Sequence, residues 1–143
     1  LSIDKPIPRE HAEIATTLFG LSSGSPMMLG DDFRRIDPER LELIKLCLPR
    51  GRRVPKPVDL FDRVFPDDYC RMLELRVEND GDTYTLLAVF NMDEVPYSAT
   101  IDFLNLELPD ADAYQVYDFW STEYSGSFAG SFVCHVGPGS CKV

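Results

Sequence analysis

The sequence lacks several features that define common protein classes. It contains no run of about 18 apolar residues, so no segment is expected to cross a membrane as a helix. It begins Leu1-Ser2-Ile3-Asp4, with neither the basic nor the apolar region of a signal peptide and without an initiator methionine. We interpret this start as following a processed segment, or as lying inside a longer protein. A secreted or periplasmic location therefore stays open.

Cysteine and histidine are scarce. The four cysteines, at positions 47, 70, 134 and 141, are too few for a disulfide scaffold, and no two have CxxC spacing. With only His11 and His135 beside them, we expect no metal site and no cofactor. Cys134 and Cys141 flank one predicted turn, so they are either bridged or two buried thiols. A bridge requires Cα atoms within about 7 Å of each other.

Basic residues are nearly absent from the second half of this 143-residue chain. Residues 1–66 carry 11 Lys and Arg against 10 Asp and Glu, whereas residues 67–143 carry 3 against 14. Nucleic acids and anionic membranes are bound through clustered Lys and Arg, so neither is expected as a partner. The sign of the charge changes next to a proline-rich stretch, which predicts a domain boundary there.

The first 48 residues predict a helix, a strand and a second helix. Apolar residues recur every three to four positions after Pro8, and Gly20 ends that pattern. The run 26–29 is short and apolar, as in a fully buried strand. Asp37 and Pro38 then form a strong helix start. One strand between two helices cannot pair its edges alone, so we expect residues 1–48 to be a slice of a larger parallel sheet.

The rest of the chain predicts a linker and a β-domain. Residues 49–68 are rich in proline and arginine and contain enough apolar residues to be an ordered linker. From residue 69 the apolar pattern alternates, and Asp80-Gly81 is typical of a hairpin turn. Expected strands span 72–77, 83–91, 97–103, 114–120, 127–136 and 140–143. The predicted class is α+β and mostly β, with an antiparallel β-sandwich over residues 69–143.

Four motifs, in order, resemble the melibiase-like glycoside hydrolases of the α-galactosidase clan. Residues 17–33, followed by Ile36-Asp37-Pro38-Glu39-Arg40, resemble the last strand and helix of the catalytic (β/α)₈ barrel. Residues 87–91 and 116–120 resemble two strands of the antiparallel domain that follows the barrel. Residues 136–141 resemble the closing segment of that domain, although Gly139 stands where the family usually has histidine.

The resemblance implies a division of roles. The parent protein would be a retaining glycosidase, whose two catalytic carboxylates lie on earlier barrel strands that this chain does not contain. The chain alone is therefore expected to be inactive, with no catalytic residue of its own. Its partners would be the missing N-terminal part of the barrel and, through that barrel, a carbohydrate. The β-domain would pack on the barrel and support it. The sugar and the oligomeric state are not predicted.

Asp31 and Asp32 are the candidate substrate-proximal residues. They follow the predicted strand 26–29 at the end where barrels of this type keep their active sites. One of them would line the pocket or orient a neighbouring group. The structural alternative is that both accept hydrogen bonds from loop amides. Side chains of neighbouring residues on an extended segment diverge, so the pair is not expected to act as a catalytic dyad.

A set of aromatic residues suggests an alternative function. Trp120, Tyr117 and Tyr124 are candidates for stacking on sugar rings, as in a stand-alone carbohydrate-binding β-sandwich. Aromatic residues at strand spacing also form cores and cross-strand pairs. Complete burial of Trp120 would count against the binding module, whereas a groove that exposes it with two tyrosines would favour the module.

Overall fold

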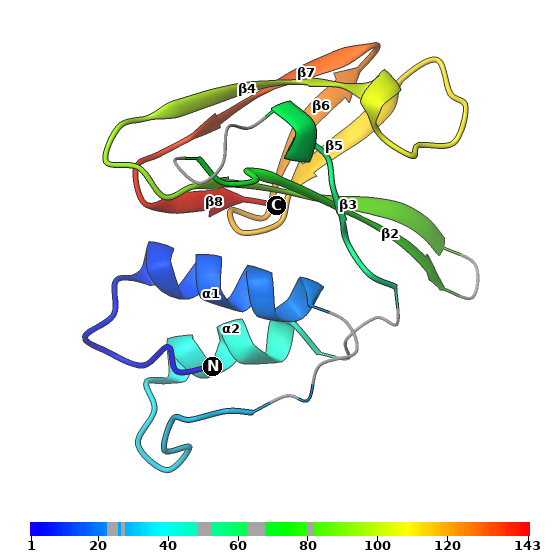
Figure 1. Cartoon of the computed structure of the whole chain (residues 1–143). Helices are drawn as coiled ribbons and strands as arrows, with labels where there is room; N and C mark the ends of the chain where they lie inside the picture. Colours follow the sequence, from blue (N-terminus) through cyan, green and yellow to red (C-terminus); the bar gives the residue numbers. More distant parts are fainter. Residues whose placement is uncertain (23–25, 27, 49–52, 63–67, 80–81) are drawn as a thin grey trace.

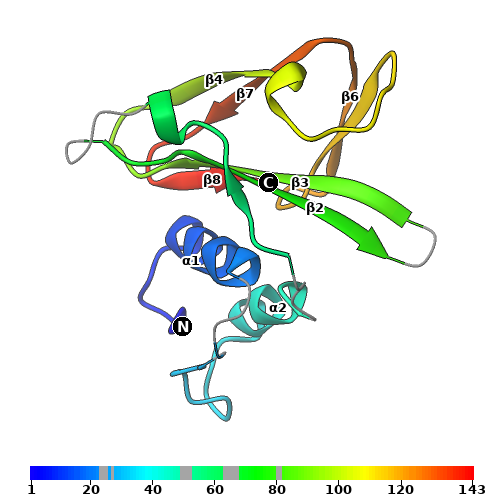
Figure 2. The same cartoon turned by 45° about the vertical axis from the view of Figure 1, so that its right-hand side comes forward.

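The computed structural model describes the chain except residues 23–25, 27, 49–52, 63–67 and 80–81. It has three layers (Figure 1). Two helices lie below a four-stranded sheet, and two further strand pairs lie above it. Figure 2, turned by 45°, shows the same stacking, with the helices against one face of the middle sheet. Neither helix has the length and apolar character needed to span a bilayer within the described residues.

The helical layer consists of α1 (Arg9–Leu21) and α2 (Pro38–Leu46). Asp37 caps α2 because its carboxylate accepts the Glu39 N–H at 3.0 Å, and Pro38 occupies the first turn, as expected. The α1 helix extends through Gly20 to Leu21, one residue beyond the predicted stop. The buried face of α1 also differs from the predicted apolar face, which includes Leu18. Thr16 and Thr17 are buried, while Leu18 is 37% exposed.

The middle sheet has the strand order β1-β2-β3-β8, with every pair antiparallel. The long hairpin β2–β3 pairs Met72 with Val89 at one end and Asn79 with Asp82 at the other, as the alternation predicts. The turn at residues 80 and 81 lies outside the described residues. The bounds are β1 (Lys56–Pro57), β2 (Met72–Asn79), β3 (Asp82–Asn91) and β8 (Ser140–Lys142).

The upper layer contains two antiparallel pairs, β4–β7 and β5–β6. Short 3₁₀ turns follow β1 and β4, at Leu60–Asp62 and Phe103–Asn105. The described part of the predicted linker 49–68 is thus partly in the sheet, because β1 pairs with β2. The bounds are β4 (Tyr97–Asp102), β5 (Tyr114–Asp118), β6 (Glu123–Phe128) and β7 (Ser131–Val136).

Three predicted elements are wrong in detail. The run 26–29 is not a strand at its described residues, because Leu1 is the one described residue that forms backbone hydrogen bonds along it. The Met28 side chain is 76% exposed. The predicted strand 114–120 ends at Asp118, whose carboxylate accepts the N–H groups of Trp120 and Ser121 in a turn. The predicted strand 127–136 is two strands, separated by a turn in which Gly130 has a φ of 76°.

Three apolar clusters hold the layers together. The first lies within the helical half and centres on Ile3, Ala12, Ile36, Leu43 and Ile44. The second joins the helices to the middle sheet through Leu21, Leu75, Ala88, Phe90 and Cys141. The third fills the sandwich between the sheets with Val89, Ala99, Ile101, Cys134 and Val136. Trp120 packs at the edge of the first two clusters.

Candidate functional site

Asp31 ties the N-terminal segment to the loop before α2. Its two carboxylate oxygens accept the N–H groups of Ile3 at 3.0 Å and Asp4 at 3.3 Å. Asp4 in turn accepts the N–H of Asp37, the cap of α2, at 3.1 Å. Asp31 therefore bonds loop amides, which is the structural role that the sequence left open for it.

Asp32 points away from this network and is exposed. Its carboxylate receives both Nε and Nη2 of Arg34 at 3.0 Å, as well as the Arg34 N–H at 3.1 Å. The hydrogen bonds from Arg34 lower the pKa of Asp32, so this carboxyl group stays ionised. The two neighbouring aspartates diverge, as expected, and Asp32 is the more exposed of the two.

Leu1 and the residues around Leu29 form one rung of parallel pairing. The Leu1 ammonium donates to the Met28 carbonyl at 2.7 Å, and the Gly30 N–H donates to the Leu1 carbonyl at 2.8 Å. Two such slanted bonds on either side of one residue are the pattern of a parallel ladder. A Cβ on Gly30 would lie 2.5 Å from Ser2 Oγ, so a larger residue there would require the Ser2 side chain to rotate away.

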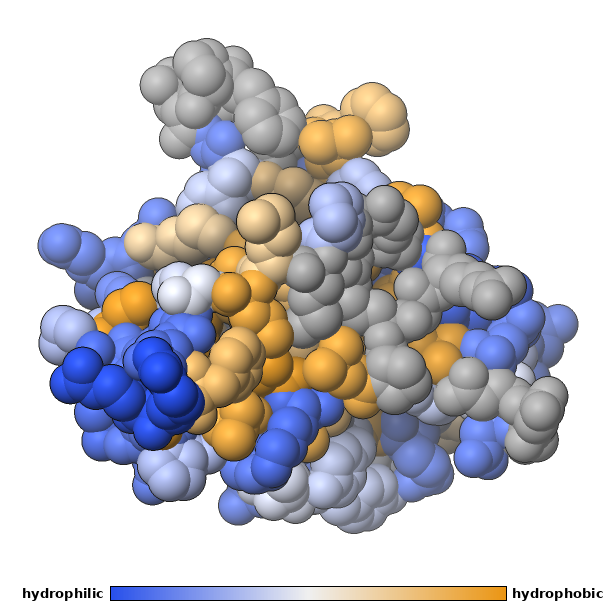
Figure 3. Space-filling model, turned by 90° about the horizontal axis from the view of Figure 1, so that it is seen from below, coloured by the Kyte–Doolittle hydropathy of each residue, from blue (hydrophilic) through white to orange (hydrophobic). Residues whose placement is uncertain are grey.

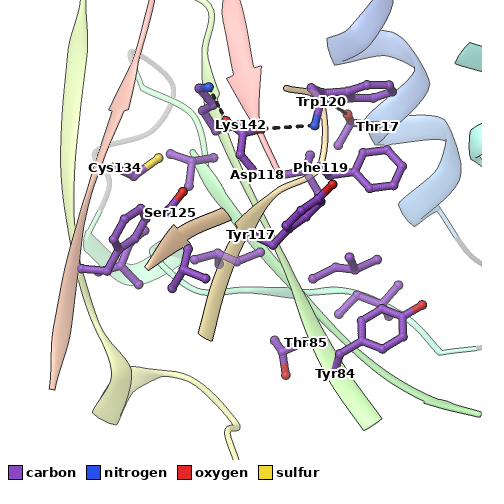
Figure 4. A pocket seen from close by; sticks show the side chains of 18 of the residues that line it. Thr17, Tyr84, Thr85, Tyr117, Asp118, Phe119, Trp120, Ser125, Cys134 and Lys142 are labelled. Carbon is purple, nitrogen blue, oxygen red and sulfur yellow. Dashed lines mark hydrogen bonds and ion pairs between the residues drawn. The ribbon is translucent and has the colours of Figure 1, made fainter. Parts of the chain in front are cut away.

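Trp120 is half-buried and directed at α1. Its indole Nε1 donates to Thr17 Oγ1 at 3.1 Å, and its ring meets Phe119 edge-to-face with centroids 5.0 Å apart. Figure 4 shows Trp120 and Thr17 facing each other from the two layers. Trp120 therefore joins the helices to the β-domain.

Tyr117 and Tyr124 do come together. They are directly opposite on the β5–β6 hairpin and are 56% and 61% exposed. The Tyr124 hydroxyl also donates to Gln115 Oε1. The three aromatic candidates thus divide into an exposed tyrosine pair and a tryptophan that points toward α1.

An ion pair between Asp118 and Lys142 was missed by the sequence analysis. The Lys142 ammonium contacts Asp118 Oδ2, while Asp118 Oδ1 accepts the turn amides of Trp120 and Ser121 (Figure 4). Burial alone would raise the pKa of Asp118, but the hydrogen bond from Lys142 and those from Ser121 hold it below the usual value. Asp118 lies within the motif 116–120, but the predicted strand continued to residue 120, so no sequence signal marked Asp118 as a strand end.

Cys134 and Cys141 are free thiols, as the reduced alternative predicted. Cys134 faces the sandwich cluster, whereas Cys141 faces the helices, so the two do not meet. Burial raises the pKa of each to about 11, which keeps both protonated at neutral pH. Over the described ranges no three His, Cys, Asp or Glu side chains form a group able to hold a metal ion.

Comparison with known families identifies the second half of the chain. Residues 75–143 match the family model for the alpha galactosidase C-terminal beta sandwich domain. The chain carries a C-terminal domain of the melibiase-like glycoside hydrolases. This confirms the resemblance expected from the strand motifs and the interpretation of the β-domain as a glycoside hydrolase C-terminal domain. No curated protein sequence matched the chain.

Solved structures share the fold of this melibiase-type domain and of the helices before it. Alpha-galactosidase I from Mortierella vinacea matches 99% of the chain with a TM-score of 0.68 and 14% identity. A β-L-arabinopyranosidase of glycoside hydrolase family 27 from Geobacillus stearothermophilus matches 96% with a TM-score of 0.71 and 17% identity. The chain covers 37% and 30% of these two proteins, so it spans about a third of their length.

Proposed function

We propose that the chain is the C-terminal part of a retaining glycosidase that acts on α-galactosides or related glycosides. In this proposal residues 1–48 are the last strand–helix unit of a (β/α)₈ barrel, residues 49–68 are the linker, and residues 69–143 pack on that barrel and support it. The similar solved structures are an alpha-galactosidase and a β-L-arabinopyranosidase, both much longer than this chain.

The parallel rung between Leu1 and Leu29 is the observation that carries the barrel proposal. Two parallel strands must be joined by a crossover of a dozen or more residues, usually a helix. Here the connection contains α1, and α2 begins at Pro38, after the loop that follows the second strand position. Strand, helix, strand and helix in this order are two consecutive strand–helix repeats of a (β/α)₈ barrel.

The exposed side chains of the helical half support the same proposal. Met28 and Phe33 are 76% and 48% exposed. Figure 3, seen from below, shows apolar side chains gathered in the middle of the face that lies away from the β-domain. Apolar surface of this kind marks a contact with another part of a protein. A neighbouring barrel unit would cover it.

Catalysis would belong to the rest of the barrel. Retaining glycosidases place two carboxyl groups about 5–5.5 Å apart across the scissile bond. Asp31 is engaged with two backbone amides, so it would position the loop. Asp32 is exposed in the loop that follows Leu29, at the end of the barrel strand where substrates bind. We therefore assign substrate contact to Asp32.

Hydrolysis of nitrophenyl α-galactoside and nitrophenyl β-L-arabinopyranoside tests the proposed function. The native polypeptide that contains this sequence is expected to hydrolyse at least one of them with retention of configuration. The 143-residue chain alone is expected to give no hydrolysis above buffer. Turnover by the chain alone, or no glycosidase activity in the native polypeptide, would contradict the proposal.

A pair of substitutions in the native polypeptide tests the site assignment. Asp32→Asn should raise KM or lower kcat about tenfold or more without changing the melting temperature. Asp31→Asn replaces one of the two acceptor oxygens by an NH2 group that faces a backbone N–H, and should lower the free energy of unfolding by about 1–3 kcal/mol. Unchanged kinetics in the folded Asp32→Asn variant would remove Asp32 from the substrate site.

A further inference from the structure

One edge of β3 is only partly paired. On one side β2 pairs along its whole length, from Asp82 to Val89. On the other side β8 pairs only with Val89, Phe90 and Asn91. From Asp82 to Ala88, that second edge has no partner strand among the described residues. An open edge of this length is unusual in natural sheets, which shorten, cover or charge their edges.

The main-chain groups at the open edge can be assigned from the register. The Phe90 N–H donates to the Arg71 carbonyl, so Phe90 directs its backbone groups toward the β2 side. Because these groups alternate along an antiparallel strand, Thr83, Thr85 and Leu87 direct theirs to the opposite side. This is the edge that β8 leaves open.

A cavity lies along this edge. It has a volume of about 1090 Å³ and is lined mainly by apolar side chains, including Leu86 and Leu87 of β3 and Val116 of β5. Figure 4 shows Tyr84 and Thr85 on one side of it, with Tyr117 and Phe119 on the other. An apolar hollow of this size beside an unpaired strand edge has room for a further element of structure.

The far side of the cavity is also a strand edge. Within the described residues β5 pairs only with β6, so its other edge is open toward the cavity. At one end the two sides meet, because the Phe119 N–H donates to the Val143 carbonyl at 2.8 Å. The residue after β8 therefore stands at the entrance of the space between β3 and β5.

We propose that this space holds one further strand, antiparallel to β3 and continuous with β8. The pairing of Lys142 with Val89 sets its register, so successive residues beyond Val143 would run toward Thr83. The strand would be covered by the sandwich on one face and by the helical layer on the other. Strands buried on both faces are apolar at successive positions, so we infer an apolar segment of about six residues. This inference does not depend on glycosidase activity.

An extension of the full chain tests the proposal. Six residues of valine and threonine are added directly after Val143, and amide hydrogen exchange is measured by NMR. The amides of Thr83, Thr85 and Leu87 are expected to exchange at least tenfold more slowly than in the unextended chain. The matched control carries an extension of the same length with two prolines, which cannot complete the ladder, and should give no protection.

Three results would overturn the proposal. These are unchanged exchange in the extended chain, equal protection by the proline control, and protection only when the same peptide is added as a separate molecule. The last result would assign the edge to a partner protein. Unchanged exchange at Phe90, which faces β2, shows in every variant that the sheet is intact.

A proline pair in the unextended chain tests the open edge without any added segment. Thr85→Pro removes an N–H that faces the cavity, whereas Tyr84→Pro removes one that faces β2. The melting temperature should fall much less for Thr85→Pro than for Tyr84→Pro. In the extended chain, Thr85→Pro should abolish the protection at Leu87. Equal losses in the unextended chain would show that the edge is already paired and would contradict the proposal.

Discussion

The helical half and the β-sandwich differ in how much of their structure is self-contained. The sandwich has its own buried cluster between paired strands and matches a domain family by itself. The helical half has a small cluster of five buried residues, one rung of parallel pairing and several exposed large apolar side chains. It is joined to the middle sheet through the cluster that contains Phe90 and through Trp120. The difference indicates that the β-sandwich can fold on its own contacts, whereas the helical half needs a further element to cover its exposed apolar side chains.

The largest effect is expected at the junction between the halves. Phe90 is 1% exposed and lies in the cluster shared by the helices and the middle sheet. Phe90→Ala should lower the free energy of unfolding by about 3–5 kcal/mol, because it leaves a cavity in that layer. Urea denaturation measures the loss. Phe61, which is 98% exposed, is the matched control, and Phe61→Ala should change stability by less than about 0.5 kcal/mol. Similar losses would refute the assigned junction.

A smaller and more local effect is expected inside the helical half. Ile44 is 2% exposed and packs only in the helical cluster. Ile44→Ala should lower the free energy of unfolding by about 2–3 kcal/mol. The loss should appear mainly as faster amide exchange in α1 and α2. Amides of β4 and β7 should keep their protection, since their cluster shares no buried residue with that of Ile44. Equal acceleration in both halves would show that the chain opens as one unit.

The hydrogen bond between Trp120 and Thr17 gives a finer test of the junction. Trp120→Phe keeps most of the ring and removes the N–H, and Thr17→Val removes the acceptor. A double-mutant cycle should give a coupling free energy of about 0.5–1.5 kcal/mol. Ser98 and His135 form an exposed hydrogen bond within the sandwich and serve as a comparison pair with weaker coupling. Zero coupling between positions 17 and 120 would contradict the contact.

The smallest expected effect is a pH dependence of stability, which arises from the ion pair between Asp118 and Lys142 in the β-domain. The folded pKa of Asp118 is below its usual value of 3.8, so its contribution to stability is complete above that value and is lost as pH falls through the folded pKa. Unfolding measured between pH 7 and pH 2 should show this loss below about pH 4. A Lys142→Met chain, which lacks the ammonium partner, should lose less over the same range. An identical pH dependence in both chains would refute the role of the ion pair.

The parts of the fold that could be predicted are those set by local physics. The Asp37 cap, the Pro38 helix start and the β2–β3 hairpin follow from backbone chemistry within a few residues. The end of β5 was misjudged because the aromatic run continues past Asp118, and only the folded turn shows that its carboxylate binds the next amides. The separate strands β6 and β7 were merged because the turn at Gly130 interrupts a weak alternation.

Features that depend on residues far apart in the sequence could not be predicted in the same way. The run 26–29 has the composition of a buried strand, yet a strand needs a partner along its length, and among the described residues this run shares only the single rung with Leu1. The open edge of β3 could not be seen in the sequence, because β8 and β3 are about 50 residues apart and their register sets where the pairing stops. For the candidate site, Asp31 and Asp32 were correctly located in a loop, but their division into an inward and an outward carboxylate required the structure.

The intact mass of the native polypeptide tests the central proposal most directly. Mass spectrometry of the native protein, identified by peptides of this sequence, should give a value more than twice the 16.2 kDa of the chain, since the proposed barrel precedes residue 1. A native mass of 16.2 kDa would show that residues 1–48 work without a barrel and would contradict the account.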